Sequence, residues 1–249
     1  MRILGDSNIN LTTALTATNY TSLDNMEKCK NFQLVDTTNF LAGNTVIDLT
    51  FGTTEPAFNC VALCGTNLTS TATMAVSYSD TDITSPDATV SMTLFSSLNQ
   101  VVFLPAAVEK KYVRITISDA AVSALTIGYI YIGSYVQYDT VEYPHNPELS
   151  IFSAPAVTGT GQGYGSKIYN SYPVKGVLSG ITNAQVLAFF EIVLEKQNID
   201  PVLLVEYEES FDNALYRPKY GVLSSNNYAY PMQESPQLFN LSFSLEERF

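Results

Sequence analysis

Short runs in which apolar and polar residues alternate recur along the first half of the chain. Residues 45–51 alternate with a period of two, as half-buried β-strands do. The run 57–68 is apolar until it ends in Gly65-Thr66-Asn67. Further strand-like runs follow at 72–79, 101–104, 112–118 and 125–132. Several short strands at this spacing, with few helical patterns, predict a β-sandwich over residues 32–137.

Residues 1–31 differ from this pattern. They alternate only weakly, at 11–18, and are too polar there for a full core strand. We therefore expect residues 1–31 to form an extended N-terminal arm. Such an arm alternates enough to add to the edge of another chain's sheet.

Two prolines within residues 143–147 favour a linker, after which a second domain is expected over 138–249. One helix is predicted at about 182–197, with Thr182 as its N-cap. Its apolar face would hold Val186, Leu187, Phe189, Phe190, Val193 and Leu194. Strands are predicted at 171–178, 202–205 and 239–246. The fold class is thus mainly β, with a jelly-roll sandwich followed by a β-sandwich or barrel carrying one α-helix.

Charge narrows the range of partners. The chain has 12 Lys and Arg against 24 Asp and Glu, a formal net charge of −12. This balance disfavours nucleic acid and anionic membranes, because both attract basic proteins. The first six residues already include Asp6, and no apolar run has the length of a membrane span. We expect a protein made and used without Sec export.

Residues that could carry out catalysis are sparse. His145 is the one histidine and lies in the proline-rich linker. The adjacent carboxylates of Glu208-Glu209, and likewise of Glu246-Glu247, would face opposite sides of a strand. Cys60 and Cys64 have the same parity and are expected to be small buried hydrophobes on one face. We expect no catalytic residue, no cofactor and no enzymatic activity.

Two loops suggest ligands at first sight. Asp80, Asp82 and Asp87 lie in one loop and are weak candidates for Ca²⁺ ligands, although they lack the EF-hand pattern. The glycine-rich segment 159–165 lacks the residue order of a phosphate-binding loop. It is interpreted as a surface loop that another subunit could order.

Tyrosine dominates the aromatic residues, with 16 Tyr and no Trp. Tyr129, Tyr131, Tyr135 and Tyr138 nearly alternate. Tyrosine offers contact area together with a hydroxyl, so these residues favour a protein interface. Sugar binding also uses aromatic rings but more often uses Trp.

The chain resembles bacteriophage structural proteins from tail gene clusters over nearly its whole length. The resemblance rests on segments 3–17, 61–79, 114–119 and 127–133, then on Gly163-Tyr164-Gly165, the helix entry at 178–182, Pro201, Tyr220-Gly221 and a last strand ending at Glu246. It implies an N-terminal galactose-binding-like (discoidin-type) jelly roll and a C-terminal domain similar to tail-tube and distal-tail proteins.

The function that the resemblance implies is structural. We expect a non-enzymatic component of the phage tail, near the tip or baseplate, located in the virion and made in the bacterial host cytoplasm. It would form a homo-oligomer and would also bind other tail proteins. It could anchor fibres for host attachment. The alternative is a carbohydrate-binding module that recognises host surface glycans.

Overall fold

A computed structural model describes residues 2–8, 14–17, 38–51, 55–93, 99–139, 141–142, 150–157, 163–171, 174–196, 200–205, 218–231 and 237–247. The chain forms two compact units. The first comprises Met1–Gln137, Val202–Tyr220 and Phe249, and the second Tyr138–Pro201 and Gly221–Arg248. The described residues are mainly strand with one helix, which confirms the expected fold class.

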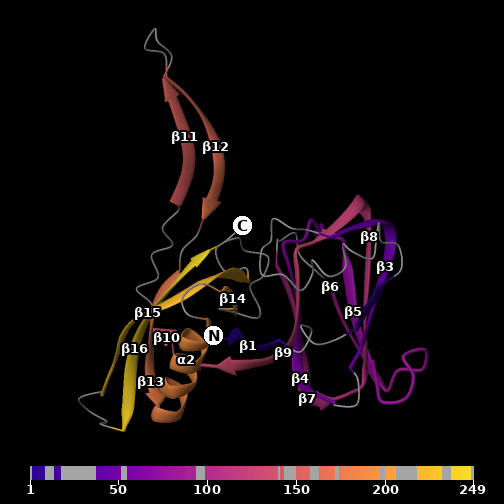
Figure 1. The fold of residues 1–249 in the computed structure, drawn as a ribbon, viewed down its shortest axis with the longest axis horizontal. Helices are drawn as coiled ribbons and strands as arrows, with labels where there is room; N and C mark the ends of the chain where they lie inside the picture. The colour runs from indigo at the N-terminus through magenta and orange to yellow at the C-terminus, as the bar shows by residue number, and fades with distance from the viewer. Residues whose placement is uncertain are drawn as a thin grey trace. The chain divides into compact units, whose positions relative to one another are not determined.

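The first unit is a two-layer sandwich of antiparallel strands (Figure 1). One sheet has the order β2-β3-β8-β5-β6, and the other, within this unit, β14-β1-β9-β4-β7. From β3 to β9 the chain crosses repeatedly between the sheets, as in a jelly roll. The bounds are β1 (Arg2–Asn8), β2 (Ala14–Ala17), β3 (Thr38–Thr50), β4 (Ala57–Cys64), β5 (Thr73–Ser79), β6 (Ala88–Thr93), β7 (Gln100–Glu109), β8 (Tyr112–Ile127), β9 (Tyr129–Gln137) and β14 (Val202–Val205).

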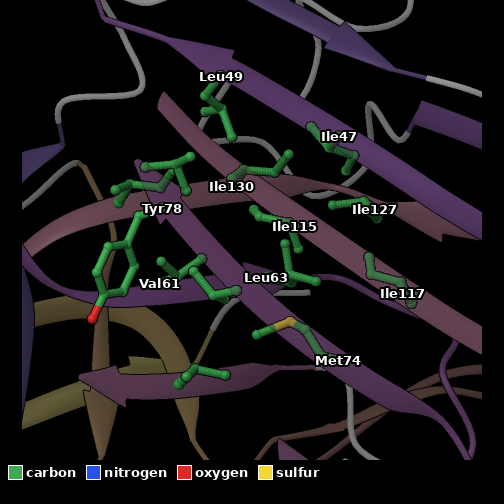
Figure 2. Packing of buried hydrophobic residues seen from close by; sticks show 14 of the residues in the cluster. Ile47, Leu49, Val61, Leu63, Met74, Tyr78, Ile115, Ile117, Ile127 and Ile130 are labelled. Atoms are coloured by element: carbon green, nitrogen blue, oxygen red, sulfur yellow. The ribbon is translucent and has the colours of Figure 1, made fainter. Parts of the chain in front are cut away.

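Alternation along the strands builds the core between the two sheets. The register pairs Met74 with Ile117 and Val76 with Ile115, so their side chains share the inner face of their sheet. Figure 2 shows Met74, Ile115 and Ile117 close to Val61 and Leu63 of the facing sheet. Val76 belongs to the same core cluster. Each fully buried aliphatic side chain contributes about 1.5–3 kcal/mol relative to an exposed one.

Strand β4 is buried on both faces from Cys60 to Cys64, which explains why every residue there is apolar. Val61 and Leu63 belong to the core between the sheets, whereas Cys60, Ala62 and Cys64 belong to a second cluster in the first unit. The expectation that the two cysteines share one face is confirmed. Burial raises the pKa of both thiols, so they remain protonated and unreactive.

Three of the four alternating tyrosines are core residues. Tyr129 and Tyr131 lie in the cluster that contains Cys60, and Tyr138 is fully buried in the second unit. The half-buried Tyr135 packs edge-on against Phe103 at a ring distance of 5.2 Å. The interface interpretation of these tyrosines is therefore wrong. A tyrosine hydroxyl can be buried when it forms a hydrogen bond, and Tyr131 Oη donates one to the Ser134 carbonyl at 2.5 Å.

The expectation of a free N-terminal arm is also wrong where the structure describes it. Strand β1 lies between β14 and β9, and Ile3 and Leu4 are buried there. Strand β2 pairs with β3, with Ala14 opposite Thr50 and Ala17 opposite Ile47. These two apolar residues are enough for a short central strand, but they are too few to form a periodic pattern in the sequence. Because β14 pairs with β1, residues 202–220 belong to the first unit, although the sequence places them in the second domain.

The second unit contains a sheet of order β10-β13-β16-β15 and a separate two-stranded sheet, β11-β12. Strand β15 begins in the first unit with Lys219 and Tyr220 and continues in the second from Gly221. Helix α2 packs on β13 and β16. The bounds are β10 (Val141–Glu142), β11 (Ser150–Val157), β12 (Gly163–Ser171), β13 (Val174–Thr182), α2 (Asn183–Lys196), β15 (Lys219–Pro231) and β16 (Leu238–Glu247).

Helix α2 begins where the sequence predicts, at a capping box. The Gln185 backbone N–H donates to Thr182 Oγ1 at 3.3 Å, and the Thr182 N–H donates to Gln185 Oε1 at 3.0 Å. The side chains buried against the sheet are Val186, Phe189, Ile192 and Val193. Leu187 and Leu194 are exposed instead, because they lie roughly 140–160° around the helix from Phe189, the middle of the buried side. No helix that the structure describes is long and apolar enough to cross a membrane.

Candidate binding and assembly surfaces

The described ranges contain no group of three or more His, Cys, Asp or Glu side chains that could hold a metal ion. Glu246 is exposed while its neighbour Glu247 is buried, so this carboxylate pair is divided between two sides of β16 as expected. His145, Glu208 and Glu209 lie outside the described residues.

The aspartate loop between β5 and β6 carries its own counter-charge. Lys110 Nζ lies 2.6 Å from Asp80 Oδ2 and 3.1 Å from Asp87 Oδ2. These hydrogen bonds raise the pKa of Lys110, and the bond from Lys110 lowers the pKa of Asp87. Asp82 is used differently: its carboxylate accepts from the Thr84 N–H and hydroxyl, and the hydroxyl contributes most to lowering its pKa. The three aspartates are therefore not gathered around one point.

Removal of divalent cations is expected to leave the melting temperature unchanged. A cation bound only by the native state would raise it by mass action, but Lys110 already compensates Asp80 and Asp87. Differential scanning calorimetry with EDTA and with added Ca²⁺ makes the measurement. A fall of several degrees with EDTA that Ca²⁺ reverses would contradict the expectation.

The Gly65-Thr66-Asn67-Leu68 segment, prominent in the sequence, is a brace between β4 and β8. Asn67 Nδ2 donates to the Ala124 carbonyl at 2.7 Å, and Asn67 Oδ1 accepts from the Thr126 N–H at 2.8 Å. The amide group thus bonds the β8 backbone as a neighbouring strand would. Leu68 anchors the segment in the core. The Gly65–Leu68 segment therefore stabilises the fold by joining the end of β4 to β8.

Asp119 completes this brace. Its carboxylate accepts from the Thr69 N–H at 2.7 Å, the Thr69 hydroxyl at 3.0 Å and the Ala121 N–H at 3.0 Å. Burial acts to raise the pKa of Asp119, but these three hydrogen bonds outweigh it and hold the pKa below its ordinary value. Asp119 is therefore charged in the folded protein at neutral pH.

Asp119→Ala is expected to lower the free energy of unfolding by about 2 kcal/mol at neutral pH, since it strands three donors. Because folding lowers the pKa of Asp119, its contribution is present above the unfolded pKa and is lost as pH falls through the folded pKa. The difference in unfolding free energy between wild type and variant should thus become smaller below about pH 4. Urea unfolding at several pH values measures it, with exposed Glu55→Ala as control. A difference that stays constant down to about pH 2 would contradict the assignment.

The outer face of the sheet β2-β3-β8-β5-β6 is polar. Arg114 forms a two-pronged ion pair with Asp48, with N–O distances of 2.6 and 2.7 Å. In the same cross-strand row, Ser77 Oγ and Thr89 Oγ1 lie 2.8 Å apart. These described side chains are polar and well solvated, and they form no apolar patch.

The β11-β12 sheet is the most distinctive surface feature of the second unit. Its two strands pair with each other, from Ser150 opposite Ser171 to Val157 opposite Gly163, with a bulge after Phe152. Among the described elements, β11 and β12 have extensive contacts with each other alone. Residues 163–165 of the glycine-rich segment belong to β12, whereas 159–162 lie outside the described residues.

The exposed side of α2 is a second surface of interest. Leu187 and Leu194 are the two exposed large apolar side chains in the described part of the chain. Sequence periodicity placed both on the buried face and missed Ile192, which is buried instead. The signal that separates them is the angle around the helix, since Ile192 lies closer to Phe189 than Leu187 does.

Comparisons with known proteins give similarities of architecture. No protein-family model and no curated protein matches the chain. Among solved structures, chitosan-binding module 1 of a chitosanase/glucanase from Paenibacillus sp. IK-5 has 14% identity and a TM-score of 0.42, over 51% of this chain and 98% of that one. A fucose binding module from Streptococcus pneumoniae, SpX-3, has 14% identity and a TM-score of 0.39, over 52% and 99%.

A third similar structure is the family 32 CBM from C. perfringens NanJ, solved in complex with galactose. It has 11% identity and a TM-score of 0.42, and the match covers 55% of this chain and 100% of that one.

Proposed function

We propose that this chain is a non-catalytic structural protein of a bacteriophage tail, near the tip or baseplate, that assembles with copies of itself and with other tail proteins. The observation that carries the assembly role is the isolated β11-β12 sheet. The phage setting rests on the sequence resemblance, and the virion is proposed as its location on the same basis.

A two-stranded sheet is a poor structure to maintain alone. An isolated hairpin is at best marginally stable in water, and each strand has an outer edge of unpaired N–H and C=O groups. Native proteins cover, charge or pair such edges. Strands β11 and β12 have 8 and 9 residues, and Lys167 is the one charged residue in 150–171. These features suit a segment that another protein chain covers.

Glycan binding by the first unit is the second candidate. The similar solved modules are a chitosan-binding module, a fucose binding module and a module in complex with galactose, so these are the sugars to test. A sugar site usually offers an open aromatic ring. Every aromatic side chain whose exposure the structure describes is buried or half-buried, so such a ring would have to come from another part of the first unit.

Light scattering after size-exclusion chromatography tests the assembly role. The full chain is expected to form a defined oligomer, and a variant with residues 150–171 replaced by a short Gly-Ser linker is expected to be a folded monomer. Equal masses for the two proteins would overturn the role of the hairpin. Calorimetric titration with galactose, fucose and chitosan oligosaccharides tests the second candidate separately.

A further inference from the structure

Helix α2 has a second apolar surface besides the one that packs on the sheet. Leu187 is 54% exposed and Leu194 is 73% exposed. Glu191, also exposed, lies four residues after Leu187 and three before Leu194, so the three residues form one line along the helix. We call this line the outer face of α2.

The outer face is unusual for a helix at the surface of a small unit. Single exposed leucines are common, but surface helices usually have one apolar side and one polar side. Here Val186, Phe189, Ile192 and Val193 already fill the side toward β13 and β16. Apolar residues on two sides are typical of a helix that is covered on both.

We propose that the outer face of α2 binds the β11-β12 hairpin of a second copy of this chain. The proposal rests on the assembly role proposed above and identifies the surface that receives the hairpin. Within one chain, the main packing partners of α2 are β13 and β16, while β11 and β12 pair with each other. Among the described elements neither surface has a further extensive packing partner, which leaves both for a contact between copies.

Charge supports this pairing. No acidic residue occurs between Glu148 and Glu191, although the chain has 24 Asp and Glu. The hairpin falls within this acid-free stretch and contributes Lys167, whereas the outer face of α2 contributes Glu191. The chain has a net charge of −12, so acidic segments of two copies repel each other. A hairpin without acidic residues approaches a second copy without this repulsion.

The contact would join two different surfaces and is therefore heterologous. Each copy presents one hairpin and one helix face, so contacts repeat head to tail and close into a ring when the rotation between copies permits. Central apolar side chains dominate such interfaces, with a polar rim around them. Leu187 and Leu194 would be the central residues and Glu191 the polar contact.

The first experiment removes the apolar contact. Leu187→Ser/Leu194→Ser should raise the dissociation constant of the oligomer about 100-fold or more without changing the melting temperature, since both residues are exposed. Analytical ultracentrifugation over a concentration series gives the constant. Ala106→Ser/Ala107→Ser, at exposed positions of β7, is the control and should have no effect.

The second experiment tests that the partner of the helix is the hairpin. Lys167→Glu and Glu191→Lys should each weaken assembly about tenfold, and the two changes combined in one chain should restore most of the loss. In addition, the Leu187→Ser/Leu194→Ser chain mixed with the hairpin-replacement chain should form a one-to-one dimer, because one chain keeps the hairpin and the other keeps the helix face.

The outcomes separate the two proposals. Loss of assembly in the hairpin-replacement chain but not in the double serine variant would overturn the assignment to α2 and keep the hairpin's role. Loss in the serine variant without formation of the mixed dimer would also overturn it, in favour of a helix-to-helix contact. A wild-type chain that stays monomeric at high concentration would overturn both.

Discussion

Deletion of residues 1–8 is expected to abolish cooperative unfolding of the first unit. Strand β1 lies in the interior of a sheet, with Ile3 opposite Leu204 of β14 and Val136 of β9. Its removal leaves both neighbouring strands without a partner. Ile3 is 0% and Leu4 is 1% exposed, so the deletion also removes two buried aliphatic side chains worth about 1.5–3 kcal/mol each. Together these losses are a large part of the roughly 5–15 kcal/mol that stabilises a typical domain.

Differential scanning calorimetry and near-ultraviolet circular dichroism are suited to this deletion. Because a deletion can act on several interactions at once, Leu4→Ala provides a graded version and should cost about 2–5 kcal/mol. Ala107→Ser, at an exposed position, is the control and should change stability by less than about 0.5 kcal/mol. A deleted chain that still melts in one sharp transition would show that β1 is dispensable.

Gly221→Ala is expected to destabilise the second unit by about 3 kcal/mol or more. A Cβ atom at Gly221 would lie 2.2 Å from the Glu246 carbonyl oxygen and 2.9 Å from the Glu247 Cα. These are backbone atoms of β16, directly opposite in the register, so no side-chain rotation relieves the overlap. The two strands would have to separate locally, which breaks pairing as well as packing.

Urea unfolding followed by circular dichroism measures this loss. Ser242→Ala, on the same β16 strand and half-buried, is the matched control and should change the unfolding free energy by less than about 1 kcal/mol. A Gly221→Ala protein as stable as this control would mean that β15 and β16 tolerate a wider spacing than the structure has.

Much of the sandwich is predictable because alternation is a local property. Strands β5 and β8 bury every second residue over most of their pairing, and β16 does so from Leu241 to Leu245. The helix is predictable for the same reason, since Thr182 and Gln185 form its cap within four residues. The run 125–132 is harder: it divides into the end of β8 and the start of β9 at Gly128, whose N–H bonds the Cys64 carbonyl.

The parts that could not be predicted depend on contacts between distant residues. The partner of Asp80 and Asp87 is Lys110, 30 and 23 positions away, so the loop sequence alone suggests a cation site. Likewise the partners of Asn67 are 57 and 59 positions away. Strand β1 is buried because it pairs with β9 and β14. The two apolar residues Ile3 and Leu4 form too short a pattern to predict a central strand. The exposure of Leu187 and Leu194 depends on which arc of α2 meets the sheet.

The position of β1 has a consequence for how the protein is synthesised. The ribosome makes β14, one of the two neighbours of β1, about 200 residues after β1, since Arg2 pairs with Val205. Until then β1 can pair with β9 but has an open edge, a state in which sheets are prone to join with other chains. Such long-range pairing also slows folding, because the chain closes a large loop before gaining the contact. The sheet of the first unit is thus completed only after most of the second unit has been translated.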